Sequence, residues 1–299
     1  MSHDIRISVT VAVAPARLFE ALMSRDDLRA WFCEDADVSP SEERYDFWGR
    51  HTVGAPARDA GRHAILAYDP PRSLSFAWNV RGGDSRVTFT VSPVPGGATL
   101  ELHHELRRGR SRTESALSDF WGGALERVKA WLEHGVRGYL PDYGTTPANE
   151  VILRTEIAAP PAEVFAALVE PAKVEQWLAL SGKSAIEPKV GGRYDIGWGD
   201  DGGPVKIVTF EPGRTLAYTW AYKNEPGTVA TWSVAEAGAP PSGKSILTIA
   251  HRGFADASIF DPYVGGWSFF LNRVKLLLET GVGRATTMTE DDFEEAALS

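Results

Sequence analysis

The pattern of hydrophobic and polar positions occurs twice along the chain. Apolar and polar residues alternate from Ile5 to Val11, which predicts a half-buried strand, and a looser version runs from Val151 to Ile157. Each strand is followed by a proline and an apolar stripe with helical spacing, over 15–22 and over 161–168. These stretches are in register at a separation of 161 − 15 = 146 residues. We therefore expect one fold built twice.

The rest of each copy has the same order of predicted elements. A second short helix is expected to end on a large aromatic residue, at Trp31 and at Trp177. Strand patterns follow, and each copy closes with a long amphipathic helix that stops at Gly135 or Gly281. This order predicts an α+β domain in each half. The predicted parts are a domain at 1–137, a linker at 138–149, a domain at 150–283 and an acidic C-terminal tail at 284–299.

Composition and charge narrow the possible partners. The chain has 299 residues, 43% hydrophobic and 24% charged, which suits two globular domains. The formal charge is 18 − 20 = −2 for residues 1–146 and 13 − 20 = −7 for the remainder, so neither half offers the positive field that nucleic-acid binding needs. The chain shows no signal peptide and no run of the roughly 18 apolar residues that a membrane helix needs. We expect a soluble, cytoplasmic protein without nucleic-acid or membrane partners.

Several familiar catalytic and metal-binding motifs are missing. Cys33 is the single cysteine, which excludes an intramolecular disulfide and a cysteine-built metal site. There is no phosphate-cradling loop, no dinucleotide motif and no nucleophile elbow, and the pair His103-His104 lacks the spacing of a zinc site. The sequence predicts no metal and no cofactor, so any catalysis would be acid–base chemistry.

Motifs spread over most of the second copy carry a resemblance to a known family. They are Pro161-x-x-x-Val-Phe-x-Ala-Leu, Trp177, Val190-Gly-Gly-Arg-Tyr, Trp220, His251-x-Gly-Phe254 and the helical stripe from Gly266-Trp267 to Gly281. This pattern resembles the START-like superfamily, which shares the fold of the birch-pollen allergen, and within it the branch of homologues of the activator of the heat-shock chaperone ATPase. The resemblance implies two tandem helix-grip domains, each an antiparallel sheet of about seven strands wrapped around a long C-terminal helix. It also implies a pocket between the sheet and that helix.

Two histidines are candidates for chemistry inside the implied pocket. His104 and His251 share strand faces with leucine and isoleucine, so both imidazoles are expected to face the apolar interior. Desolvation there would lower the pKa and keep the rings neutral, able to exchange a proton near neutral pH. His251, with Tyr222 or Tyr263 as a proton relay, is the acid–base candidate. The alternative is a core histidine in each copy, hydrogen-bonded to a neighbour.

Aromatic side chains dominate the predicted interior. Most residues of this kind simply pack a core, but the 10 Trp exceed what a small core needs, and flat side chains suit a planar ligand. The candidate ligand contacts are His104, Trp31, Tyr45, Phe47, Trp78, Phe89, Trp121, Trp177, Tyr194, Trp198, Trp220, Trp232, Phe254 and Trp267.

The copies differ in segments that are expected to decide what each one binds. The first has Glu42-Glu43 where the second has Gly191-Gly192, and His104-Glu-Leu where the second has His251-Arg-Gly-Phe. Four arginines precede the last helix of the first copy: Arg107, Arg108, Arg110 and Arg112. They are interpreted either as a solvated loop or as the pocket mouth, where they would hold an anionic substituent or an acyl carrier protein with its phosphopantetheine arm.

Three functions follow from the resemblance and the aromatic interior. Tandem helix-grip domains resemble the aromatase/cyclases of polyketide pathways, so the first hypothesis is a protein of secondary metabolism, such as antibiotic biosynthesis, that binds a hydrophobic, polyketide-like molecule and assists its cyclisation. The second hypothesis is a non-catalytic binding protein, as in self-resistance proteins that sequester a reactive product such as an enediyne. The third is a co-chaperone that stimulates a chaperone ATPase.

Overall fold

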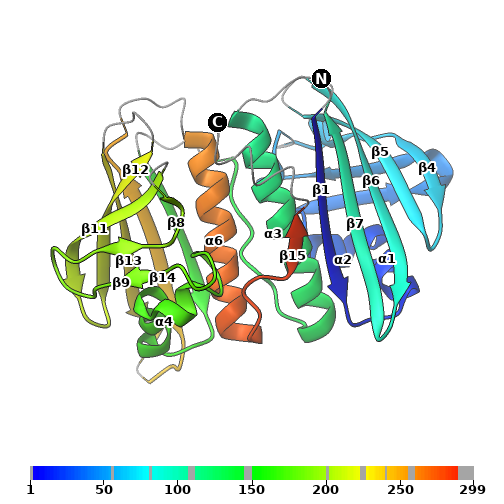
Figure 1. The fold of residues 1–299 in the computed structure, drawn as a ribbon. Helices are drawn as coiled ribbons and strands as arrows, with labels where there is room; N and C mark the ends of the chain where they lie inside the picture. Colours follow the sequence, from blue (N-terminus) through cyan, green and yellow to red (C-terminus); the bar gives the residue numbers. More distant parts are fainter. Residues whose placement is uncertain are drawn as a thin grey trace. The chain divides into compact units, whose positions relative to one another are not determined.

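The chain folds into two compact units (Figure 1), described here from a computed structural model. Unit 1 consists of Met1–Thr146 with Ala285–Ser299, and unit 2 of Pro147–Arg284. The structure describes residues 3–54, 57–80, 83–106, 112–144, 150–199, 202–222, 227–239, 241–254 and 260–288. Each unit contains one copy of the sequence repeat.

Unit 1 has a main sheet whose described strands run in the order β15-β1-β7-β6-β5-β4 with antiparallel neighbours. β2 and β3 form a separate two-stranded sheet. The elements are β1 (His3–Val11), α1 (Pro15–Met23), α2 (Arg25–Trp31), β2 (Asp35–Ser39), η1 (Pro40–Glu42), β3 (Arg44–Trp48), η2 (Arg58–Gly61), β4 (Ile65–Asp69), β5 (Ser73–Val80), β6 (Gly83–Val94), β7 (Gly97–Leu106), α3 (Arg112–His134) and β15 (Thr286–Met288).

Unit 2 repeats this plan with shorter peripheral elements. Its main sheet has the order β11-β12-β13-β14-β8, and β9 and β10 form the small sheet. The elements are β8 (Glu150–Ile157), α4 (Pro161–Val169), α5 (Pro171–Val174), β9 (Ala185–Ile186), β10 (Tyr194–Asp195), β11 (Gly202–Glu211), β12 (Thr215–Tyr222), β13 (Thr228–Glu236), β14 (Ser245–Arg252) and α6 (Phe260–Thr280). The second short helix differs from the prediction, because α5 ends at Val174 and Trp177 lies in the turn that follows.

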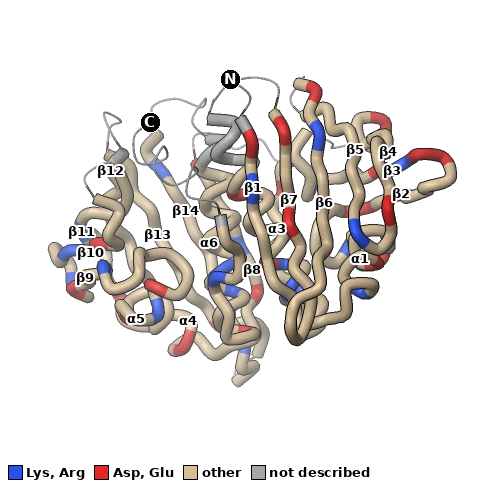
Figure 2. The backbone as a smooth tube through the Cα atoms, turned by 45° about the vertical axis from the view of Figure 1, so that its right-hand side comes forward, with Lys and Arg blue, Asp and Glu red and all other residues tan. Residues whose placement is uncertain are grey.

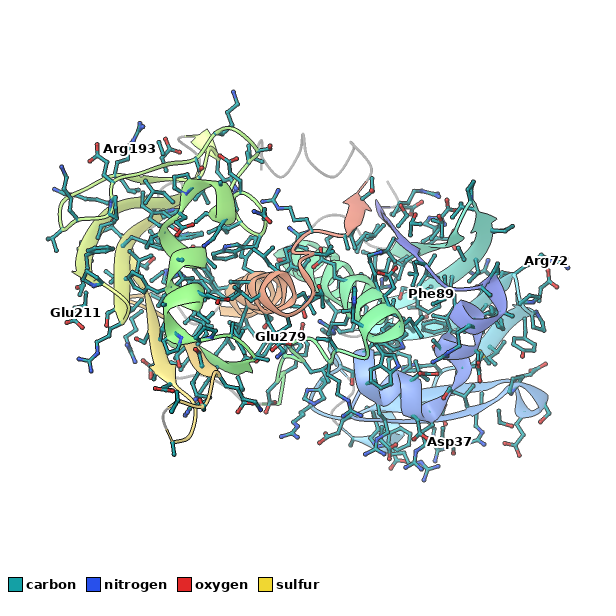
Figure 3. All side chains as sticks on the ribbon, turned by 90° about the horizontal axis from the view of Figure 1, so that it is seen from below. Asp37, Arg72, Phe89, Arg193, Glu211 and Glu279 are labelled. Atoms are coloured by element: carbon teal, nitrogen blue, oxygen red, sulfur yellow. The ribbon has the colours of Figure 1, made fainter. Side chains whose placement is uncertain are left out.

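These units confirm the predicted fold class, α+β with two tandem helix-grip domains. In each unit the sheet curves around the long helix, which packs on the first strand of its own copy: α3 on β1 and α6 on β8 (Figure 3). Phe89, labelled in Figure 3, shows how the interior closes in unit 1, since its ring centroid lies 5.8 Å from that of Trp121 on α3. Along the described backbone, basic and acidic residues are interspersed without a continuous basic stripe (Figure 2).

Two aromatic side chains fix the repeated helix in each unit. In unit 1, the Trp31 indole donates to the Ala21 carbonyl at 3.1 Å, and the Tyr45 hydroxyl donates to the Leu22 carbonyl at 2.7 Å. These carbonyls lie in the last turn of α1, where no further helical N–H is available. The equivalent bonds in unit 2 run from Trp177 to Ala167 and from Tyr194 to Leu168, at 2.9 Å and 2.7 Å. The repeated stretch is therefore held at the same two points in both copies.

A carboxylate from the long helix satisfies the backbone where the first strand ends. Glu279 accepts the Ala158 backbone N–H at 2.8 Å and pairs with Lys275 at 2.6 Å. Glu133 makes the equivalent bonds in unit 1, to the Ala12 N–H at 2.6 Å and to the Lys129 ammonium at 2.7 Å. The last turn of the helix is thus tied to the turn between strand and first helix.

Segments after each domain pack against unit 1. β15 pairs with β1, with Ile7 opposite Met288 and Val9 opposite Thr286, and the Thr286 hydroxyl donates to Glu126 at 3.1 Å. In the expected linker, the described residues 138–144 bind unit 1 as well, since the Pro141 carbonyl lies 2.8 Å from Nδ1 of His51. The acidic run that follows β15 lies outside the described residues.

We expect Glu279→Ala to lower the free energy of unfolding by about 1 kcal/mol, because it removes the acceptor of the Ala158 N–H and the ion-pair partner of Lys275, which keeps its bond to the Glu156 carbonyl. Urea denaturation followed by circular dichroism measures this change. Glu163→Ala, at an exposed position of α4, is the matched control and should change the value by less than about 0.5 kcal/mol. Equal effects of the two variants would contradict the role of Glu279.

Candidate functional site

The interior of unit 2 contains a chain of hydrogen bonds that joins helix to sheet. The Trp267 indole on α6 donates to Nδ1 of His251 at 2.9 Å, and Nε2 of His251 lies 2.6 Å from the Thr228 hydroxyl on β13. That hydroxyl donates in turn to the Trp220 carbonyl on β12, at 3.5 Å. One imidazole therefore connects the long helix to three neighbouring strands.

Unit 1 has the same chain of hydrogen bonds, and only its last bond is shorter than the equivalent bond in unit 2. The Trp121 indole donates to Nδ1 of His104 at 3.0 Å, and Nε2 of His104 lies 2.7 Å from the Ser85 hydroxyl. Ser85 then donates to the Trp78 carbonyl at 2.7 Å. Neither Ser85 nor Thr228 was anticipated from the sequence, although their equivalent places in the two copies (228 − 85 = 143) were a usable signal.

These contacts determine the protonation state of both imidazoles. An indole N–H can only donate, so Nδ1 accepts and the ring proton lies on Nε2, which donates to the hydroxyl. His104 and His251 are fully buried, and burial lowers the pKa of each to about 3. The predicted interior position is confirmed. The rings are neutral at pH 7, as expected, and both nitrogens of each are occupied, so proton exchange near neutral pH stays a prediction.

The proposed proton relays of His251 are placed only in part. The ring of Tyr263 lies against His251, with centroids 4.8 Å apart and the planes nearly perpendicular. The side chain of Tyr222 lies outside the described residues. An acid–base role for His251 stays a prediction, since its ring nitrogens bond to Trp267 and Thr228 and no open nitrogen faces Tyr263.

The aromatic interior of unit 1 is closed. Trp78 stacks on His104 with centroids 5.5 Å apart, and Phe47 and Phe120 cover it at 5.6 Å and 5.8 Å. Of these side chains, none is more than 3% exposed, so no planar molecule can reach them without rearrangement. Cys33 lies in the same core, where burial raises the pKa of its thiol.

The aromatic interior of unit 2 extends to the surface. Trp198, Tyr263 and Phe270 are half-buried, and they contact the buried indoles of Trp220 and Trp267. Trp198 meets Trp220 edge-on at 5.9 Å and lies 5.7 Å from Phe270, while Phe270 lies 6.2 Å from Trp267. Phe270 was not among the residues predicted from the sequence. Phe254, which was, lies 4.5 Å from the His251 ring.

The repeat register explains why the two interiors differ. Three aromatic positions of unit 1 carry smaller residues in unit 2, and each of the three in unit 1 is buried. The pairs are Phe32 and Leu178, Phe47 and Ile196, and Phe120 and Gly266. Gly266 matters most, because Phe120 covers the indoles of Trp78 and Trp121 in unit 1. This difference can be read from the aligned copies once the role of Phe120 is known.

The remaining predicted contacts are structural or undescribed. Trp31, Tyr45, Trp177 and Tyr194 hold the repeated helices, as described above, and Trp232 donates to the Tyr218 hydroxyl at 2.8 Å. The arginines at 107–110 and the side chain of Arg112 lie outside the described residues. Within the described part of the chain, no three His, Cys, Asp or Glu side chains are placed to hold a metal ion. No described helix is long and apolar enough to cross a membrane.

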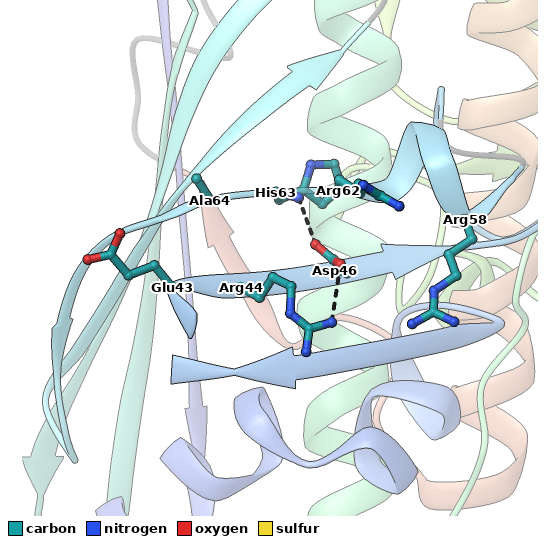
Figure 4. Close-up of a pocket in the computed structure, with 7 residues that line it drawn as sticks. All are labelled: Glu43, Arg44, Asp46, Arg58, Arg62, His63 and Ala64. Carbon is teal, nitrogen blue, oxygen red and sulfur yellow. Dashed lines mark hydrogen bonds and ion pairs between the residues drawn. The ribbon is translucent and has the colours of Figure 1, made fainter. Parts of the chain in front are cut away.

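A separate pocket of about 610 Å³ opens on the surface of unit 1 between β3 and η2 (Figure 4). Its lining residues are Glu43, Arg44, Asp46, Arg58, Arg62, His63 and Ala64. Asp46 accepts the backbone N–H of His63 at 3.0 Å and lies 3.8 Å from Arg44. Arg44 and Arg58 both bond to Asp37 at 2.7 Å, so most of the charge is compensated by neighbours. The imidazole of His63 packs inward on Phe47, 4.1 Å between centroids, and burial lowers its pKa to about 4.

The fold and the paired interiors define the class of protein, a tandem START-like protein with helix-grip domains. The family model for Activator of Hsp90 ATPase homolog 1-like protein matches residues 12–133 and again 158–279, and the chain belongs to this family. The resemblance inferred from the sequence is therefore confirmed. Family and interior together support a ligand-binding START-like protein. A search of curated protein sequences gave no match.

Several solved structures are similar to this chain. DynU16, a protein of the dynemicin biosynthetic locus, is 16% identical with a TM-score of 0.37, and the match covers 90% of this chain and 96% of that one. CalU16 from Micromonospora echinospora is 20% identical with a TM-score of 0.37, covering 50% and 81%. The Aha1 dimer from Colwellia psychrerythraea is 21% identical with a TM-score of 0.36, covering 44% and 97%.

We expect acidification to lower the free energy of unfolding of the protein, and His251 to account for part of that loss. Folding lowers the pKa of this ring from 6.5 to about 3, so below pH 6.5 the unfolded chain binds the proton first. The free energy of unfolding therefore falls as pH drops through this window, by up to about 1.4 kcal/mol per pH unit for one ring. His251→Leu should make the slope between pH 6 and pH 4 shallower by that amount, measured by urea denaturation.

The control for this experiment is His134→Gln, which changes an exposed ring at the end of α3. It should keep the slope of the unchanged protein. If His251→Leu kept that slope too, the ring would not be neutral in the folded state.

Proposed function

We propose that unit 2 binds a planar, hydrophobic small molecule between α6 and its main sheet, and holds it without converting it. The observation that carries this proposal is the continuous aromatic surface from half-exposed Trp198, Tyr263 and Phe270 to buried Trp220 and Trp267. Aromatic side chains left partly in water at the opening of an apolar interior gain by covering a flat ligand. An aromatic, polyketide-like product of secondary metabolism has this shape.

Binding is favoured over acid–base catalysis by the state of His251. A general acid or base works best with a pKa near the working pH and with a nitrogen free to reach the substrate. The pKa of His251 is about 3, and both nitrogens bond to protein groups. The imidazole therefore supports the interior rather than reacting in it. Sequestration, one of the alternatives considered from the sequence, needs only this arrangement.

In this proposal the two units have different roles. Unit 1, whose interior is filled by Phe47 and Phe120, serves as a stable partner domain. Unit 2, which has Ile196 and Gly266 at these positions, holds the ligand. The proposal thus predicts one molecule bound per chain rather than two.

We expect isothermal titration calorimetry with anthracene-2-sulfonate, a flat and water-soluble probe, to show one site per chain. Trp198→Ala should weaken binding at least about fivefold, because it removes an aromatic wall of the site. Gly266→Phe, which introduces the residue of unit 1, should weaken it further by placing a phenyl ring next to Trp267. Trp48→Ala is the matched control, a half-buried tryptophan on β3 of unit 1, and should bind as the unchanged protein does.

Two outcomes would count against the proposal. One is the lack of any saturable binding by the folded protein. The other is equal weakening by Trp198→Ala and Trp48→Ala, which would place the probe outside unit 2.

A further inference from the structure

Two tryptophans at equivalent places have buried indole N–H groups without a hydrogen-bond partner. They are Trp78 and Trp220, which are 220 − 78 = 142 residues apart, the same separation as the turns that precede their strands. Their side chains are almost fully buried, at 1% and 6% exposure. The other indoles that line the interiors are satisfied: Trp31, Trp121, Trp177, Trp232 and Trp267 each donate to a carbonyl, an imidazole or a hydroxyl of the protein.

An unsatisfied indole donor is unfavourable in an apolar interior. The N–H can only donate, and a buried donor without an acceptor costs about 1–3 kcal/mol. Around Trp220 the neighbouring rings of Trp198 and Trp267 lie edge-on at 5.9 Å and 5.0 Å. They offer π faces, which are weaker acceptors than oxygen lone pairs. The indole N–H of Trp220 is therefore a buried polar group whose natural partner is an oxygen that the described protein does not supply.

We propose that the indole N–H of Trp220 donates a hydrogen bond to a carbonyl oxygen of the bound molecule. The inference rests on the proposed function, since it names the chemical class of the ligand for the same site: a planar conjugated ketone or quinone rather than a plain hydrocarbon. A carbonyl is the suitable partner because it accepts without bringing a donor. Beside Trp220 the ring nitrogens of His251 and the hydroxyl of Thr228 already have partners, so a second donor would be left unsatisfied.

The equivalent group in unit 1 does not offer the same site. Trp78 is covered by Phe47 and Phe120, and His63 beside it has a second unpartnered atom, Nε2. The ring centroids of Trp78 and His63 are 6.3 Å apart. A small hydroxyl group would suit both atoms, because it can accept from the indole and donate to an imidazole. Of the two tryptophans, only Trp220 has half-exposed aromatic neighbours, Trp198 and Tyr263.

The test compares two probes that differ by their carbonyl groups, anthraquinone-2-sulfonate and anthracene-2-sulfonate, by isothermal titration calorimetry on the full chain. We expect the quinone to bind about 2- to 10-fold more tightly, which corresponds to one hydrogen bond. Trp220→Phe keeps an aromatic ring but removes the N–H, so it should abolish this preference while the anthracene affinity changes less than about twofold. Trp78→Phe is the matched control in unit 1 and should keep the preference of the unchanged protein.

The outcomes separate this inference from the proposed function. If neither probe binds, the proposed function fails. If both bind unit 2 equally well, or if Trp220→Phe keeps the preference for the quinone, the carbonyl contact is wrong although the binding site stands. Circular dichroism and the urea midpoint of each variant verify folding, and Trp232→Phe, which loses an N–H that is bonded to Tyr218, provides a second comparison if Trp220→Phe does not fold.

Discussion

The hydrogen-bonded imidazole beneath the long helix is the constraint on which each unit depends. A helix packed on an apolar sheet can slide or rotate at little cost, because hydrophobic contact has no direction. The bond from the Trp267 indole to His251, continued through Thr228 to the carbonyl of Trp220, fixes one turn of α6 over three named strands. Loss of the imidazole would leave the Trp267 indole N–H without its acceptor and the Thr228 hydroxyl without its donor. These hydrogen bonds therefore fix the position of α6 relative to the sheet.

Both copies share this hydrogen-bonded chain, so their interiors differ in the side chains that surround it. The positions occupied by Phe47 and Phe120 enclose the interior of unit 1. With Ile196 and Gly266 in their places, the same framework in unit 2 leaves its indoles flanked by half-exposed rings. A duplicated domain can in this way keep its fold through one interaction that both copies share. Changes at a few aromatic positions then alter what its interior can hold.

Strand phase and helical spacing were sufficient for the repeated order of elements, because these patterns are local and strong, and the family resemblance supplied the helix-grip arrangement. The same phase correctly placed His104 and His251 inside. It could not supply their partners, because Ser85 and Thr228 meet the imidazoles only through the register of neighbouring strands. The pairing of β15 with β1 was equally inaccessible, since Thr286–Met288 is too short to show a strand pattern. The half-buried ring of Phe270 stands at a position that is Ala124 in unit 1, and no single-copy pattern indicates it.

The geometry around His251 supports the proposal that unit 2 binds a molecule rather than converting it. Burial lowers the pKa of His251 to about 3, so the ring is neutral at pH 7, and this neutral form has no free nitrogen to offer. Unused bonding capacity near this ring is found instead at the indole N–H of Trp220 and on the half-exposed rings of Trp198 and Tyr263. Those are features of a binding surface: apolar contact supplies affinity, and one directed donor selects among flat molecules. The imidazole that first suggested catalysis is what holds that donor in place.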